Sequence, residues 1–401
     1  MTTTHLIRQK NPPAILSLGF RPFFLLGSIY AAVLIALWVP WFLGLISVPS
    51  AFPPTAWHAH ELLFGFVPAI VAGFLLTAVP NWTGRAPVRG PSLGALVLLW
   101  LTGRIALALS AHLDPWLTAA LCVSFPLALA AVIGREIVAA KNWRNLKIVG
   151  ALIGLAGADA LFHYEVFEFG RLKHAQTLAV AVALLLVMTI AGRIIPFFTT
   201  NWLKQNRPGA LPQLFGRYDM AAMVLSGAAL LGWACLPVLE SLTAQARPIV
   251  GSAMIAAAAA NFYRQSRWTP LRTFAEPLLA ILHVAYVFVG LGFLLSGLGV
   301  LNDNFEFASA GLHAWTTGAI GTMIIAVMTR VSRGHSGRKL TAPASTVVLY
   351  ATALIATCAR IGAALHPELT SILLPVSGAA WILAFGGFAA LYGPMLMKQR
   401  L

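Results

Sequence analysis

Long apolar segments recur along the whole sequence and constrain the fold more than any other feature. A helix needs about 20 apolar residues to cross a bilayer. With 59% hydrophobic and only 10% charged residues, the chain does not have enough polar side chains to cover a water-soluble fold. We therefore predict an all-α integral membrane protein with about twelve transmembrane helices, near residues 23–46, 59–80, 92–111, 115–134, 147–165, 174–198, 219–238, 248–262, 275–299, 307–329, 345–364 and 371–397.

The predicted spans leave little chain for anything else. The longest polar connection is the basic stretch from Trp202 to Asp219, which divides the helices into six and six. This stretch is too short for a separate domain, so residues 1–401 are predicted to form a single polytopic membrane domain. Because Met1 to Pro13 is polar and the first apolar run is a full span, we expect no cleaved signal peptide.

The 27 lysine and arginine residues are distributed unevenly between the loops that these spans create. One alternating set of loops holds most of them, whereas the other holds only Arg171, Lys173 and Arg247 beside several acids. This segregation is typical of the positive-inside rule, so both termini are predicted to be cytoplasmic. The net charge of +15 could also indicate nucleic-acid binding, but basic loops separated by membrane spans do not form one patch. We expect the lipid bilayer, and no nucleic acid, as a partner.

Histidines recur at matching places in these spans. The second, sixth and tenth spans open with His58-Ala59, His174-Ala175 and His313-Ala314. The second and tenth also end in similar strings, Thr83-Gly84-Arg85 and Ser336-Gly337-Arg338. Spans spaced four apart predict three pseudo-repeated four-helix units. Since ionisable residues inside a membrane are rare and usually functional, one layer of histidines near the outer face predicts a metal- or cofactor-binding site.

Six longer strings along the chain are distinctive: Gly19 to Phe24, Trp57 to Glu61, Ala78 to Arg85, Asn142 to Leu146, Gly192 to Thr199 and Thr329 to Arg338. They resemble those of NnrS proteins, in the same order and over almost the whole chain. The resemblance implies a bacterial inner-membrane protein that contains haem and copper, is associated with denitrification genes and contributes to tolerance of nitric oxide. It implies binding of nitric oxide or another small diatomic ligand, and it leaves turnover and the electron donor open.

A looser similarity is to the catalytic subunit of haem-copper oxidases and nitric oxide reductases. That subunit also has twelve helices in three fourfold units, with histidines on helices two, six and ten. It carries a close histidine pair on helix ten and another pair near the end of helix seven. Here His313 is followed by Ala314 and Trp315, and the close pair, His58 and His60, lies on the second span. The oxidase metal centre therefore cannot be carried over as it stands.

Two facing imidazoles could hold a b-type haem. A six-coordinate haem needs one imidazole on each side of its ring, and His313 with either His58 or His60 meets this demand. Residues two apart on a helix point about 200° from each other, so only one of that pair can face the haem. We favour His58, because Gly65 and other small residues fall close to its face. Such a stripe admits a flat macrocycle or, equally, a closely packed helix.

The remaining intramembrane histidines are candidate copper ligands. Imidazole suits copper, and His163, His174 and His283 lie in or beside the fifth, sixth and ninth spans. Ligands from different helices could form a site that is open to a small diatomic molecule. A hydrogen-bonded structural histidine is the alternative for each of them, most of all for His283, which lies nearer the other end of its span.

Four charged residues lie near this layer. Glu61 and Asp159 are candidate proton relays, and Asp159 precedes His163 by one helical turn, where a carboxylate could orient a metal-bound imidazole. Arg104 and Arg360 could pair with haem propionates, because guanidinium binds carboxylate through two parallel hydrogen bonds. Structural roles remain open for all four, including salt bridges between these arginines and acids.

Two classes of function follow from the sequence. The first is a haem- and copper-binding membrane protein that binds nitric oxide, with enzymatic redox activity undecided. The second is a polytopic transporter of a metal or small solute, whose histidines line a path and hold the substrate transiently. An optical spectrum distinguishes the two classes, since only the first predicts a haem absorption.

Overall fold

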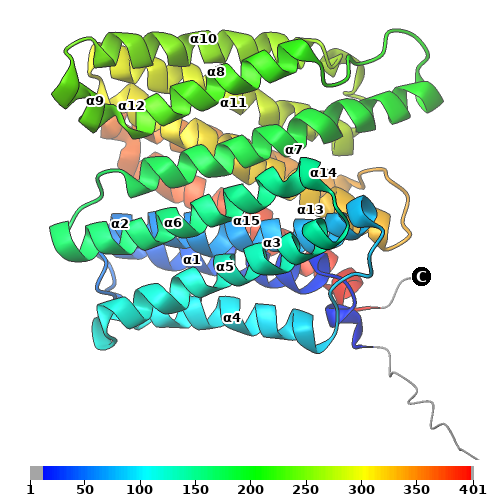
Figure 1. The fold of residues 1–401 in the computed structure, drawn as a ribbon, viewed down its shortest axis with the longest axis horizontal. Coiled ribbons are helices and arrows are strands. Elements are labelled where there is room, and N and C mark those ends of the chain that lie inside the picture. Colours follow the sequence, from blue (N-terminus) through cyan, green and yellow to red (C-terminus); the bar gives the residue numbers. More distant parts are fainter. Residues whose placement is uncertain (1–11, 399–401) are drawn as a thin grey trace, which may run out of the picture.

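The computed structural model describes residues 12–398, which form a bundle of helices without strands (Figure 1). Two of the helices contain a π-helical segment, Glu61–Phe66 and Ala314–Gly321. The α-helices are α1 (Phe20–Phe42), α2 (Pro54–His60), α3 (Val67–Thr83), α4 (Pro91–Ala108), α5 (Pro115–Ala139), α6 (Leu146–Phe169), α7 (Ala175–Asn206), α8 (Arg217–Ala234), α9 (Leu236–Leu242), α10 (Ala246–Ser266), α11 (Pro277–Asn302), α12 (Phe305–His313), α13 (Thr322–His335), α14 (Ala344–Leu365) and α15 (Thr370–Met397).

The helices confirm an all-α integral membrane protein. Within residues 12–398, 10 helices are long and apolar enough to cross a bilayer, and continuous helices run from Pro54 to Thr83 and from Phe305 to His335. The pair α8 and α9 would make the count 11, but it is bent by 74°. Helix α10, which matches the span expected at 248–262, is not among them. The count of twelve spans is therefore not confirmed, and the three four-helix units stay a prediction.

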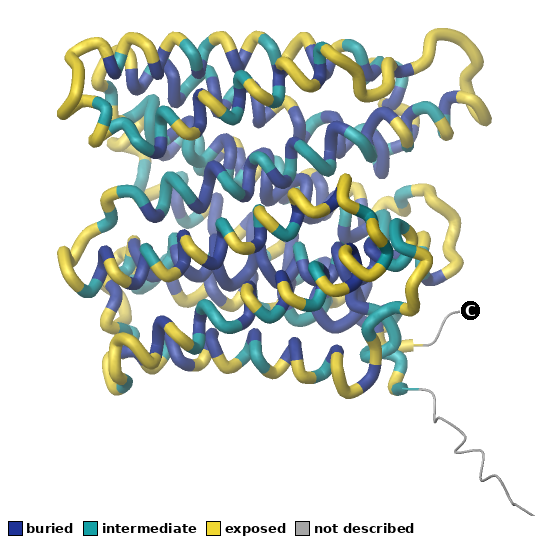
Figure 2. The backbone as a smooth tube through the Cα atoms, in the orientation of Figure 1, coloured by how far each residue is buried: buried dark blue, intermediate teal, exposed yellow. Residues whose placement is uncertain are grey.

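Helix α7 runs across the middle of the bundle (Figure 1). In Figure 1, α4 and α5 lie at one edge of the bundle, α8 and α10 lie at the opposite edge, and α7 runs between them. Helix α1 packs against both α3 and α15, so the first and last long helices are neighbours. Figure 2 shows the buried residues gathered between the helices and the exposed ones at the loops and along the outermost helices.

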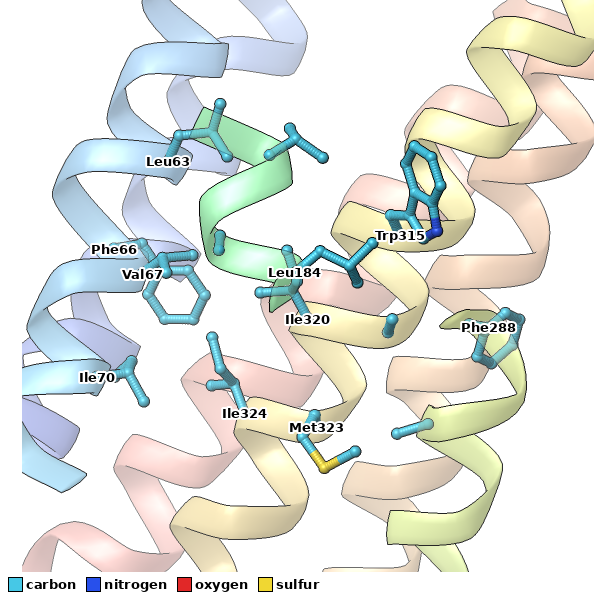
Figure 3. Packing of buried hydrophobic residues seen from close by; sticks show 14 of the residues in the cluster. Leu63, Phe66, Val67, Ile70, Leu184, Phe288, Trp315, Ile320, Met323 and Ile324 are labelled. Carbon is cyan, nitrogen blue, oxygen red and sulfur yellow. The ribbon is translucent and has the colours of Figure 1, made fainter. Parts of the chain in front are cut away.

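The centre of the bundle is packed with aliphatic and aromatic side chains. Figure 3 shows Phe66 and Val67 facing Ile320 and Ile324 across the space between two neighbouring long helices. Lipid chains are as apolar as the helix surfaces, so the hydrophobic effect does not drive membrane helices together. They associate instead through close packing, which small residues permit. Gly299 of α11 is one example, since a Cβ there would lie 2.5 Å from the backbone nitrogen of Ala308.

Basic loops lie at one end of this bundle. The turns after α3, α5 and α13 carry Arg85, Lys141 and Arg338 at that end, whereas Arg171 and Lys173 follow α6 at the other. This distribution agrees with alternate crossing by the helices. The segments 1–11 and 399–401, whose cytoplasmic position the sequence predicts, lie outside the described residues.

Single cysteines test this topology. In a Cys235→Ala, Cys358→Ala background, which keeps only the buried Cys122, Lys141→Cys and Lys173→Cys each add one exposed thiol. We expect an impermeant maleimide to label Lys141→Cys only from the cytoplasmic side and Lys173→Cys only from the other side. Labelling of both from the same side would contradict a membrane crossing by α6.

Candidate functional site

A cavity lies at the end of the bundle opposite the basic loops. Its walls come from α1, the helix Pro54–Thr83, the start of α7, the helix Phe305–His335, α14 and α15, and it contains about 840 Å³ of empty space, part of it open to the surroundings. Most of the lining is apolar, and the polar side chains include His58, His313, Arg360 and Gln176. The structure thus brings the predicted haem ligands and one predicted propionate partner to the same cavity.

The three basic side chains in this cavity lack protein partners. Within residues 12–398, His58 and His313 make no hydrogen bond through their rings, and Arg360 makes no ion pair with a carboxylate. The ring of His58 stacks on Trp38 with centroids 3.8 Å apart, which fixes its plane. Polar groups without partners in an apolar wall cost free energy. A haem would supply partners for all three, because its iron can bind two imidazoles and its propionates can bind a guanidinium.

Both histidine-bearing helices change to a π-helix directly after the site. The π segment Glu61–Phe66 follows His60, and the π segment Ala314–Gly321 follows His313. π-Helical turns are rare and occur mostly at functional positions. The second and tenth predicted spans therefore share this departure from regular geometry as well as their histidines.

The π segment also explains why the expected stripe of small residues does not line the cavity. In a regular α-helix with 3.6 residues per turn, Gly65 would lie on the same face as His58. In the structure the cavity is lined by Leu62, Leu63 and Phe66 after His58. Gly65 faces α4 instead, where its carbonyl accepts a hydrogen bond of 2.9 Å from Trp100. Of the two readings of the stripe, the closely packed helix agrees with the structure.

His60 points away from the cavity into a separate buried polar group. Its Nε2 lies 2.8 Å from Oδ1 of Asp159 and 3.1 Å from Nε2 of His163, both on α6. All three side chains are 0% exposed, and aromatic rings of Phe52 and Phe162 pack against them. The structure thus confirms that His58 and His60 face different surroundings, and it places Asp159 beside His163 as the sequence predicted.

Cys122 of α5 completes this group, and the sequence analysis missed it. Ligand atoms of His60, Cys122 and His163 all lie within 4.8 Å of one another, which makes the three a candidate metal centre. The spacing of cysteines along the chain gave no signal, because three helices meet here only in the folded bundle. Depth in the membrane could have given a signal, since all three residues lie about two turns from the helix end that faces away from the basic loops. This end is the N-terminal one for His60 and Cys122 and the C-terminal one for His163.

Arg104 and Glu61 form an ion pair beside the same group. The guanidinium of Arg104 donates to Oε1 of Glu61 at 2.7 Å, and both side chains are buried. A Cβ at Gly65 would lie 2.6 Å from Arg104 and 2.8 Å from Glu61, so a glycine is needed for the pair to fit. Arg104 is thus paired with an acid of the bundle, which was the alternative to a role at haem propionates.

His174 and His283 lie elsewhere. His174 precedes α7, where its Nδ1 is 3.2 Å from the carbonyl oxygen of Ala234. The Nε2 of His283, on α11, lies 3.0 Å from the hydroxyl of Thr199. Neither belongs to the group around His60 and His163. Of the three predicted copper ligands, His163 alone belongs to the candidate metal centre. A metal-binding role for His174 and His283 stays a prediction.

Comparison with known proteins gives one result for this chain. The family model described as NnrS protein matches residues 14–400, which is nearly the whole sequence. No match was found among curated proteins.

The buried ion pair predicts an asymmetric mutational response. Arg104→Met leaves the Glu61 carboxylate unpaired in an apolar interior, so we expect the free energy of unfolding in mixed micelles to fall by about 3–5 kcal/mol. The double variant Glu61→Leu, Arg104→Met should recover most of this loss. As a control, Arg85→Ala removes a half-exposed cation that pairs with Glu136, and should cost no more than about 1 kcal/mol. Equal losses of unfolding free energy in Arg104→Met and Arg85→Ala would contradict an ion pair that is shielded from water.

Proposed function

The chain belongs to the NnrS family, and from this premise we propose that it binds haem and copper and acts in the response to nitric oxide. We place it in the bacterial inner membrane with both termini cytoplasmic. One observation carries the proposal: a single helix, Pro54–Thr83, directs His58 into the cavity of His313 and Arg360, and directs His60 into the group of His163 and Cys122.

The cavity is the proposed haem site. His58 and His313 would supply the two imidazoles, and the unpaired guanidinium of Arg360 would bind a propionate. The stacked ring of Trp38 holds the plane of His58, and the apolar lining excludes water. A haem held in this way would supply a redox-active iron, whose potential would depend on the two imidazoles and on the apolar lining.

The buried group is the proposed copper site. Two nitrogens that bind one tetrahedral ion are about 3.3 Å apart, close to the 3.1 Å between the Nε2 atoms of His60 and His163. Imidazole and thiolate are ligands that copper accepts readily, and Cys122 provides the sulfur. Oδ1 of Asp159 faces the same Nε2 atoms, 2.8 Å from that of His60 and 3.6 Å from that of His163, so Asp159 would supply an oxygen ligand beside the two imidazoles and would not orient them from their other ring nitrogens. A copper ion held there would bind nitric oxide or another diatomic molecule.

A haem role for the cavity predicts a spectroscopic loss. In purified protein, His58→Ala and His313→Ala should each remove or convert the haem absorption in the reduced-minus-oxidised spectrum. The matched control is His366→Ala, an exposed histidine that contacts Glu368, whose spectrum should equal that of the unmodified protein. A haem absorption unchanged in both cavity variants would contradict the cavity as the haem site, and absence of haem from the unmodified protein would favour the transporter.

A copper role for the buried group predicts a separate effect on metal content. His60→Ala, His163→Ala, Cys122→Ser and Asp159→Asn should each lower the copper-to-protein ratio, because each removes an atom that faces the proposed ion. The haem spectrum should persist in all four, because none of these side chains lines the cavity. Loss of haem and copper together in every variant, with normal folding, would contradict two separate sites.

A further inference from the structure

A second cleft opens at the basic end of the bundle. It lies between α3, α7 and the start of α6, and contains about 820 Å³ of empty space, part of it open to the surroundings. It shares no residue with the cavity of His58 or with the group around His60. What it binds is therefore a question separate from haem and copper.

Cations without acidic partners surround this cleft. Arg144 and Arg193 line it, and Lys147 follows Arg144 by one helical turn. Within residues 12–398 none of the three forms an ion pair with a carboxylate, and Arg193 donates only to the side-chain oxygen of Asn145, at 3.4 Å.

Two arginines near the cleft have an acidic partner. Arg85 and Arg135 share the carboxylate of Glu136. Arg144 and Arg193 have no such partner within residues 12–398, so the cleft combines free guanidinium groups with its own apolar lining.

Much of the remaining lining of the cleft, called here its floor, is apolar. It comprises Phe74 and Trp82 of α3, Ile148 of α6, and Ile190 and Ile194 of α7. An inorganic anion would gain nothing from these side chains. An amphiphile with a negative head and a hydrocarbon chain would contact both the cations and the floor.

We propose that this cleft binds an anionic phospholipid of the adjacent leaflet. Its phosphate pairs with Arg144 and Arg193, since guanidinium matches the geometry of phosphate oxygens. One acyl chain lies on the isoleucines of α6 and α7. Basic pockets between membrane helices on the cytoplasmic side are suited to such head groups, and the sequence places these loops on that side.

Native mass spectrometry of the full chain tests the proposal. After delipidation in detergent, the protein is titrated with phosphatidylglycerol and, separately, with phosphatidylcholine. We expect phosphatidylglycerol to be retained in preference. Arg144→Gln and Arg193→Gln should each weaken this binding about fivefold, as expected for loss of one cation near a lipid head group. Arg89→Gln, an exposed arginine at the same end but outside the cleft, is the matched control and should bind normally.

An uncharged variant separates the cleft from general surface charge. Thr189→Trp fills the cleft and keeps every cation, so it should also lose phosphatidylglycerol. The thermal unfolding midpoints of the delipidated variants should match, which excludes misfolding as the cause. Unchanged binding in Thr189→Trp, or an equal loss in Arg89→Gln, would overturn the proposal. Displacement of the lipid by inorganic phosphate alone would show a small-anion site and would overturn it as well.

Discussion

The structure depends on one constraint: a charged side chain inside an apolar bundle needs a compensating partner, from the protein or from a ligand. Glu61 and Arg104 form a buried ion pair, and Asp159 lies against the imidazoles of His60 and His163. An unpaired charge at this depth would cost several kcal/mol. These pairs therefore tie the helix Pro54–Thr83 to α4 and α6, and they fix the direction in which His60 points. Because His58 is two residues away, it must face elsewhere, and there it meets the cavity.

The π-helical segments set how these faces are arranged. Each follows a histidine of the site, at Glu61–Phe66 and at Ala314–Gly321. Such a segment changes the angular spacing of side chains, so that Gly65 turns to α4 while Leu62, Leu63 and Phe66 line the cavity. The helix Pro54–Thr83 can thus contribute His58 to the cavity and His60 to the buried polar group. The same departure occurs in both helices.

The two ends of the bundle differ in their chemistry. The end with few basic loops holds imidazoles, a thiol and carboxylates in dry surroundings. The opposite end carries most of the lysines and arginines, and some of these remain without acidic partners around an apolar cleft. Segregation of this kind orients a membrane protein, and each end has side chains suited to a different proposed ligand: metal and haem at one, an anionic lipid at the other.

The sequence by itself determined the membrane class, the all-α fold and the family, because hydropathy and local strings are properties of consecutive residues. The single domain and the layer of histidines stay predictions. The relation of Asp159 to His163, which lie one turn apart on the same helix, also follows from the sequence. Only the tertiary structure decided the partners of His60, the inclusion of Cys122, the pairing of Arg104 with Glu61 and the separation of His174 and His283 from the metal group. These contacts join different helices, and regular helical spacing fails across a π segment. Positions along the chain therefore could not reveal them.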